Sequence, residues 1–211
     1  MLLDSDDVTF AGGQCTDNRT GKSVSLAQIA GASYRAMKLP PNTEPGMVAT
    51  YFWEPPNFAF PFGAHICVSE VDRDTGQVEI KRYVAVDDCG NQINPLLVDG
   101  QVHGGVVQGL GQALYEQAVY DDDGQLVTGE LMDYAIPKAS MVPWIESSHT
   151  TTPSPVNPLG VKGVGEAGTI GCSPAVVNSV VDALADLGVR HIDMPLTPEK
   201  LWNLIHQGGQ A

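Results

Sequence analysis

Two segments in which apolar and polar residues alternate constrain the fold of this chain more than any other feature. They span residues 65–71 and 78–86, and between them lies the turn Asp74-Thr75-Gly76. Alternation with a period of two places the apolar side chains on one face of a strand, and a short connection containing glycine joins antiparallel neighbours. The pattern therefore predicts a β-hairpin with one buried and one solvated face, so other elements must cover its apolar side.

Helical patterns later in the chain supply that cover. One helix is predicted from Asn94-Pro95 to about residue 118, and its apolar residues recur every four positions, at Val102, Val106, Leu110 and Leu114. A later helix is predicted to have Ser173 as its N-cap and Pro174 at its first position, and to end at Gly188. Thr197-Pro198 repeats the start signal for a final helix. Antiparallel hairpins packed with separate helices indicate the α+β class.

The first part of the chain has weaker signals. Ser25 is a predicted N-cap for a short helix over residues 26–34, and prolines then interrupt the chain at 40–41 and 45. Residues 47–53 are a strand candidate, and the run Asp121–Gly124 predicts a solvated hairpin turn. We therefore divide the chain into residues 1–45, which continue from an absent upstream domain, and a C-terminal domain of residues 46–211.

The charge balance excludes several classes of function. The chain has 25 Asp and Glu against 11 Lys and Arg, a formal charge of -14, which disfavours binding to nucleic acid or to an anionic membrane surface. No run approaches the ~18 apolar residues of a spanning helix, and the N-terminal residues do not resemble a signal peptide. The four cysteines are widely spaced without a C-x-x-C pair, so reduced thiols are expected. A cytoplasmic protein is the resulting prediction.

The segment 162–171 contains four glycines in ten residues, which is costly unless the backbone needs unusual dihedrals or a close approach. Its G-x-G-x-x-G spacing resembles a dinucleotide-binding loop, but Pro158-Leu159-Gly160 stands where a strand should be, and the ribose-binding acid is missing. What remains is one carboxylate, Glu166, between glycines. Where backbone excludes water, such a group has a raised pKa and suits a general base. Composition alone favours an exposed loop glutamate instead.

A resemblance to a known family changes that balance. Residues 157–168 resemble the C-terminal signature of the xanthine oxidase and aldehyde oxidase family, whose large subunit binds a molybdenum cofactor. Residues 87–95 and 100–105 are similar to the cofactor-facing strand end and helix start of that family. Residues 51–57 and 60–64 are similar to its aerobic carbon monoxide dehydrogenase branch in particular. The resemblance covers nearly the whole chain and implies that residues 46–211 are a C-terminal molybdopterin-binding domain.

The resemblance implies a role for particular residues. Glu166 matches the glutamate that stands beside molybdenum and acts as the catalytic base. The residues implied to bind the cofactor are Gln101, Asp88, Cys89, Gly90, Gly104, Gly105, Lys162, Gly163 and Gly165. None is implied to be a metal ligand. Two alternatives stay open: Cys89 is equally an ordinary core thiol, and Gly109 and Gly111 are equally explained by close packing without a ligand.

The implied cofactor is molybdopterin cytosine dinucleotide with molybdenum, together with copper in a complete carbon monoxide dehydrogenase. The implied partners are the remainder of the large subunit, an iron–sulfur subunit and an FAD subunit, and the substrate is a small molecule. The leading hypothesis is the C-terminal portion of a molybdenum-containing oxidoreductase. The alternatives are a molybdenum hydroxylase for an aldehyde or an N-heterocycle, and an isolated domain that is inactive without its partners.

Overall fold

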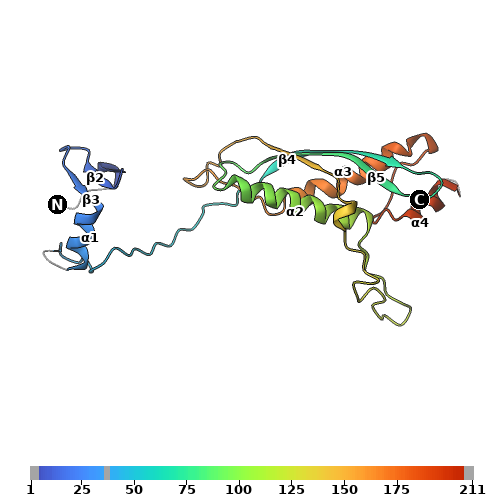
Figure 1. The fold of residues 1–211 in the computed structure, drawn as a ribbon, viewed down its shortest axis with the longest axis horizontal. Coiled ribbons are helices and arrows are strands. Elements are labelled where there is room, and N and C mark those ends of the chain that lie inside the picture. The colour runs from blue at the N-terminus through green and yellow to red at the C-terminus, as the bar shows by residue number, and fades with distance from the viewer. Residues whose placement is uncertain (1–4, 36–38, 207–211) are drawn as a thin grey trace. The chain divides into compact units, whose positions relative to one another are not determined.

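The structure, a computed structural model, describes residues 5–35 and 39–206 of the chain. It divides into two compact units, residues 1–54 and 55–211, and each is described by itself (Figure 1). The division falls after Glu54, nine residues beyond the sequence-based boundary, and the functional boundary after residue 45 stays a prediction. No helix in the described ranges is long and apolar enough to cross a membrane.

The first unit contains a small antiparallel sheet and one helix. A 3-10 turn, η1 (Ser5–Asp7), precedes the sheet, and the strands in order are β1 (Val8–Ala11), β2 (Gln14–Asp17) and β3 (Ser23–Ser25). Helix α1 (Leu26–Tyr34) confirms the predicted helix. The Ser25 hydroxyl accepts a hydrogen bond from the Gln28 N–H, and the Gln28 side chain accepts one from the Ser25 N–H. The three strands were not predicted, because none is longer than four residues and so short a segment carries too little pattern.

The strand predicted over residues 47–53 is wrong. This segment has no partner strand in the part of the chain that the structure describes, and Phe52 is 91% exposed. A strand requires a neighbour to satisfy its N–H and C=O groups, so β-branched and aromatic residues alone did not suffice.

The second unit is built on a three-stranded sheet in the order β4 (Phe62–Val71), β5 (Val78–Asp88), β6 (Ile145–His149). Strands β4 and β5 form the predicted antiparallel hairpin, and Gly76 lies in its turn with a φ of 73°. Strand β6 pairs with β5 in parallel. It was not predicted, because five residues inside a proline-rich stretch carry too little periodicity. The α+β class is confirmed, with one parallel pair added to the antiparallel hairpin.

Three helices complete this unit: α2 (Pro95–Leu114), α3 (Ala167–Ala183) and α4 (Pro198–His206), with 3-10 turns η2 (Ala139–Met141) and η3 (Ala185–Leu187). Helix α2 begins as predicted, with Asn94 as its N-cap and Pro95 in its first turn, but it ends four residues earlier than expected. Helix α4 starts at the predicted Pro198. The predicted end of the late helix at Gly188 is wrong, because α3 ends at Ala183. Gly188 instead ends the following turn η3, with a left-handed φ of 79°.

The predicted start of the late helix at Ser173 is wrong. Helix α3 begins seven residues earlier, at Ala167 in place of Pro174, with Glu166 as its N-cap and Pro174 inside it. Proline leaves the carbonyl four residues before it without a helical donor. Here that residue is Ile170, which is 66% exposed, so water can hydrate its carbonyl. Ser173 instead donates a hydrogen bond to the Gln112 side chain on α2.

Helices α2 and α3 run beside each other against the sheet and enclose the core (Figure 1). The core residues from β5, α2 and α3 are Tyr83, Ala85, Val102, Val106, Leu110, Cys172, Val176 and Val180. The helices approach closely through glycines. A Cβ on Gly168 would lie 2.5 Å from the Val102 carbonyl oxygen, and a Cβ on Gly109 would lie 2.5 Å from the Cys172 Cβ. Close packing against α3 therefore accounts for Gly109.

We predict that Gly168→Ala lowers the free energy of unfolding by about 1–3 kcal/mol, because the added methyl forces the two helix backbones apart. Gly100→Ala is the matched control, since a Cβ at that α2 position meets nothing within 4 Å. It should stabilise the chain by about 0.5–1 kcal/mol. Urea denaturation measures both effects, and equal stabilities for the two variants would contradict the packing argument.

Candidate functional site

Glu166 lies at the N-terminus of α3, and its carboxylate is available to other groups. As the N-cap it has a φ of -107° and a ψ of -3°, and its side chain makes no capping hydrogen bond. Its backbone carbonyl accepts the Ile170 N–H at 3.0 Å, so the main chain alone begins the helix. The residue is exposed, which differs from the buried position expected of a general base. Among the described residues of the second unit, none covers this carboxylate from solvent.

The Gln101 side chain lies next to the segment that carries Glu166. Gln101 is exposed on the second turn of α2, and its Oε1 is 3.9 Å from the place that a Cβ on Gly165 would occupy. Gly163 is also exposed and is anchored by its N–H, which donates to the Ala59 carbonyl at 3.2 Å. Five of the predicted residues are thus exposed in this unit: Gln101, Gly104, Gly163, Gly165 and Glu166.

The charged residues among the predicted cofactor contacts bind each other instead of facing solvent. The Lys162 Nζ lies 3.0 Å from the Asp88 Oδ1, with side-chain exposures of 9% and 0%. The Asp88 carboxylate also accepts the Gly90 N–H at 2.9 Å and the Thr150 hydroxyl at 3.0 Å. The Lys162 ammonium lies 4.3 Å from the centre of the Phe62 ring, a cation–π distance. Asp88 and Lys162 therefore support the loop, and a direct contact with cofactor stays a prediction.

Hydrogen bonds determine the protonation state of Asp88. Burial by itself would raise the pKa of this carboxyl, but hydrogen bonds from the Gly90 N–H and the Lys162 ammonium hold it below the usual value. The carboxylate thus stays ionised and paired beneath the surface.

A backbone ladder joins the end of β5 to the loop before α3. Gly90 forms an isolated antiparallel bridge with Val161, and the Lys162 N–H donates to the Cys89 carbonyl at 2.8 Å. Gly90 has a φ of 69°, and a Cβ there would lie 2.1 Å from the Gly160 carbonyl oxygen, so only glycine fits. Cys89 is 3% exposed, and burial raises the pKa of its thiol. Cys89 and Gly90 therefore attach the loop before α3 to the end of β5.

Gly105 has the same supporting character. It is buried, and a Cβ on it would lie 2.9 Å from the Thr169 backbone nitrogen of α3. Its neighbour Gly104 is exposed with open space around it. Gly105 therefore lies in the contact between α2 and α3, whereas Gly104 lies on the surface.

Sequence reasoning missed a buried polar group beside the start of α3. The His65 Nδ1 lies 2.7 Å from the Tyr83 hydroxyl, and its Nε2 lies 3.3 Å from an Asp87 carboxylate oxygen. Burial, followed by the nearby Cys172 thiol, raises the pKa of Tyr83 well above its usual value. Strand alternation alone could have placed His65 on the inner face. Only the hairpin register brings the three side chains together, because His65 pairs with Ala85, between Tyr83 and Asp87.

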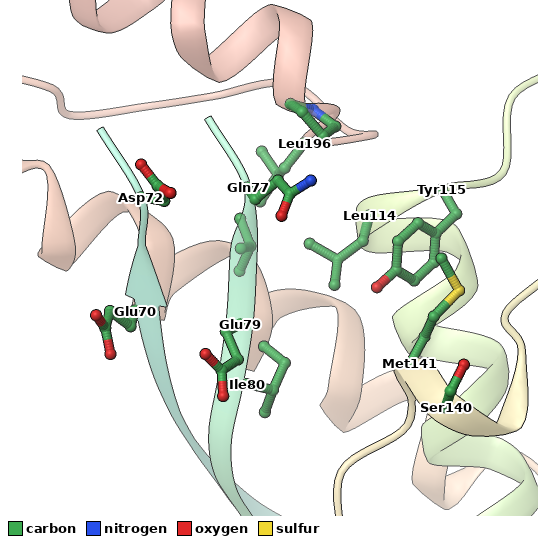
Figure 2. A pocket seen from close by; sticks show the side chains of 12 residues that line it. Glu70, Asp72, Gln77, Glu79, Ile80, Leu114, Tyr115, Ser140, Met141 and Leu196 are labelled. Atoms are coloured by element: carbon green, nitrogen blue, oxygen red, sulfur yellow. The ribbon is translucent and has the colours of Figure 1, made fainter. Parts of the chain in front are cut away.

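Two further features lie away from these residues. His149 on β6 pairs with Asp99 on α2 at 2.7 Å. A cavity of about 680 Å³ adjoins the C-terminal end of α2 and the β4–β5 turn (Figure 2), and its lining includes Leu114, Tyr115, Glu70 and Glu79. None of the predicted site residues lines this cavity. Among the described residues, no three His, Cys, Asp or Glu side chains are placed to hold a metal ion.

Comparison with known proteins decides the family. The profile of the molybdopterin cofactor-binding domain matches residues 1–143, more than half of the chain. The chain belongs to this family. It is 42% identical to the carbon monoxide dehydrogenase large chain of Hydrogenophaga pseudoflava, over 90% of this chain and 23% of that protein.

Solved structures extend the similarity of this molybdopterin cofactor-binding domain. Reconstituted CO dehydrogenase from Oligotropha carboxidovorans matches with a TM-score of 0.88 and 37% identity, over 97% of this chain and 25% of that one. Quinoline 2-oxidoreductase from Pseudomonas putida 86 matches with a TM-score of 0.89 and 39% identity, over 97% and 26%. The chain thus spans about a quarter of the length of these relatives, and the predicted family membership is confirmed.

The exposed residues offer chemical groups that suit a molybdopterin. Gln101 offers an amide donor and acceptor for the polar edge of a pterin. Gly163 and Gly165 are exposed and lack side chains, so a planar group can approach their backbone closely. The N-terminus of the 17-residue helix α3 favours negative charge, such as that of a phosphate. Gln101, Gly163, Gly165 and the start of α3 would hold the cofactor.

We predict that Asp88→Asn lowers the free energy of unfolding at neutral pH. The variant should also lose less stability than the wild type when the pH is lowered. Because the folded pKa of Asp88 is lowered, its stabilising effect is full above the unfolded pKa of about 4 and is lost as the pH falls below it. Urea denaturation between about pH 7 and pH 2 measures the slope. Asp123→Asn, an exposed change of the same chemistry, is the control. Parallel curves for wild type and Asp88→Asn would contradict the assignment.

Proposed function

We propose that this chain is the C-terminal part of the large subunit of a molybdenum-dependent oxidoreductase of the carbon monoxide dehydrogenase type. The observation that carries the proposal is the Glu166 carboxylate, which is exposed at the α3 N-terminus and is not used to cap the helix. The preceding residue, Gly165, lies next to the Gln101 amide. The family profile and the similarity to carbon monoxide dehydrogenase over 90% of the chain support it.

In this proposal each residue has a separate task. Gln101 orients the pterin through its amide, and the glycine backbone at 163 and 165 allows the close approach. When bound, the molybdenum centre would supply the redox chemistry. Glu166 takes up a proton at its carboxylate during turnover, as a general base, and releases it afterwards. Asp88 and Lys162 keep the loop rigid, so that the carboxylate stays in position.

We further propose that the remainder of the large subunit covers this surface and excludes water from Glu166. Large apolar side chains are exposed on the elements that carry the site: Ile93, Leu96, Leu97, Leu159 and Ile170 are 60–80% exposed. Exposed apolar groups of this size are typical of an interface. An iron–sulfur subunit and an FAD subunit would carry the electrons away, and the assembled enzyme would work in the cytoplasm.

Two substrate classes fit the same site. Carbon monoxide is our first choice, with molybdopterin cytosine dinucleotide and an additional copper in the complete enzyme. A hydroxylase acting on an N-heterocycle or an aldehyde is the second, since the chain is as similar to quinoline 2-oxidoreductase as to CO dehydrogenase. Copper content of the complete complex separates the two, because only the first requires it.

We predict that Glu166→Gln in the complete enzyme retains molybdenum but lowers turnover by at least ~100-fold, because an amide cannot take up the proton. Metal analysis and steady-state kinetics with carbon monoxide or the heterocycle test this. Glu199→Gln, an exposed glutamate in the first turn of α4, is the matched control and should leave turnover unchanged. Near-normal turnover in Glu166→Gln would remove Glu166 from the role of base.

We predict that the purified 211-residue chain alone contains little molybdenum and does not oxidise carbon monoxide. The cofactor would be bound on one side only, and Glu166 would stay in water. Metal analysis and an electron-acceptor assay measure this. Stoichiometric molybdenum with turnover in the isolated chain would show that no further polypeptide is needed.

A further inference from the structure

A buried histidine faces the first two turns of α3 and has no part in the proposed chemistry. The side chains of His65 and Asp87 are 3% and 4% exposed, and their ring nitrogen and carboxylate lie 3.3 Å apart. The carboxylate can only accept, so the His65 Nε2–H donates to it, and in the neutral ring the Nδ1 accepts from the Tyr83 hydroxyl at 2.7 Å. Tyr83 stays protonated because burial raises its pKa. Both ring nitrogens are therefore bonded, and the ring orientation is defined.

Two glycines on different elements enclose this pair. Gly63 on β4 lies opposite Asp87 in the strand register, and a Cβ on it would be 2.3 Å from the Asp87 Oδ1. Gly171 on α3 touches the histidine, since a Cβ there would lie 2.6 Å from the His65 Nδ1. The imidazole thus fills the space that a side chain at residue 171 would occupy and bears directly on the α3 backbone.

The same group reaches toward the helix start. A cavity of about 110 Å³ is lined by His65 and Asp87 on one side and by Ala167 and Gly171 on the other. Ala167 follows Glu166 directly and is 8% exposed. The imidazole and the carboxylate therefore line the side of this cavity that faces the start of α3, and the direct contact of the imidazole is with Gly171 in the second turn.

We propose that His65, held by Asp87 and Tyr83, is a positioning residue that fixes the N-terminus of α3 and with it the Glu166 carboxylate. The proposal rests on the proposed function only where it assigns a catalytic role to Glu166. The claim that His65 fixes the start of α3 depends on the imidazole ring, its two hydrogen bonds and its contact with Gly171. An aliphatic side chain would fill the space, but it could not bond to Asp87, so that carboxylate would be left buried without its partner.

The test is amide hydrogen exchange on the full 211-residue chain, which requires neither metal nor activity. In His65→Ala, the amides of residues 170–173, the first that donate to helical carbonyls, should exchange at least about tenfold faster, while those of residues 176–183 change less. His65→Gln, whose amide can still donate to Asp87, should recover part of the protection. Val180→Ala is the control, because it removes buried methyl groups from the far half of the same helix.

A second readout uses the complete enzyme. If His65 positions Glu166, His65→Gln should lower kcat by about tenfold or more, while KM and molybdenum content stay at the wild-type values. A merely structural residue would lower the yield or cofactor content instead. Should His65→Ala not fold, His65→Gln and Asp87→Asn carry both measurements.

The outcomes separate the two proposals. Unchanged protection at residues 170–173 in the His65 variants overturns the positioning role, whatever Glu166 does. The same selective loss in Val180→Ala also overturns it, because general destabilisation would then be the cause. Selective loss in the His65 variants together with full turnover in Glu166→Gln supports the positioning of the helix and removes the base assignment.

Discussion

The close contact between the backbones of α2 and α3 is the constraint on which the rest of the second unit depends. Gly105 and Gly168 meet there, and a Cβ on either would lie within 3 Å of the other helix. Because the two helix backbones are in direct contact, Gln101 near the start of α2 and Glu166 at the start of α3 lie on the same surface. A wider spacing, with side chains between the helices, would separate the amide from the carboxylate. Glycine is thus needed for the geometry of the site as well as for packing.

Two buried polar pairs lie under that surface. Asp88 and Lys162 connect β5 to the loop before α3, and His65 and Asp87 connect β4 and β5 to its first turns. The buried Asp88–Lys162 charge pair adds little net stability, because desolvation offsets much of the attraction, but any arrangement that separates its partners is strongly disfavoured. Separating His65 from Asp87 would leave a buried carboxylate without its hydrogen-bond donor. Both pairs therefore act by restricting where Glu166 lies. This arrangement of rigid support beneath exposed functional groups is what a precise site requires.

The second unit exposes polar and large apolar residues on the elements that carry the candidate site. Gln101, Gly163, Gly165 and Glu166 are exposed, and so are apolar residues such as Leu96. A chain that spans about a quarter of its relatives' length would leave such a surface where it meets the remaining polypeptide. The same exposure explains why the carboxylate lies in water here, whereas a general base is expected to be shielded.

The sequence by itself determined the elements with strong local signals. It predicted the β4–β5 hairpin from alternation and the start of α2 from Asn94-Pro95, and the glycine-rich motif pointed to the family that the comparisons confirm. The roles of the site residues stay predictions. Only the tertiary structure decided that α3 begins at Ala167, because its packing on α2 overrides the local start signal at Ser173 and Pro174. It alone decided that Asp88 pairs with Lys162 and that His65 meets Asp87, because such contacts depend on strand register and on residues up to 74 positions apart, which no local pattern encodes.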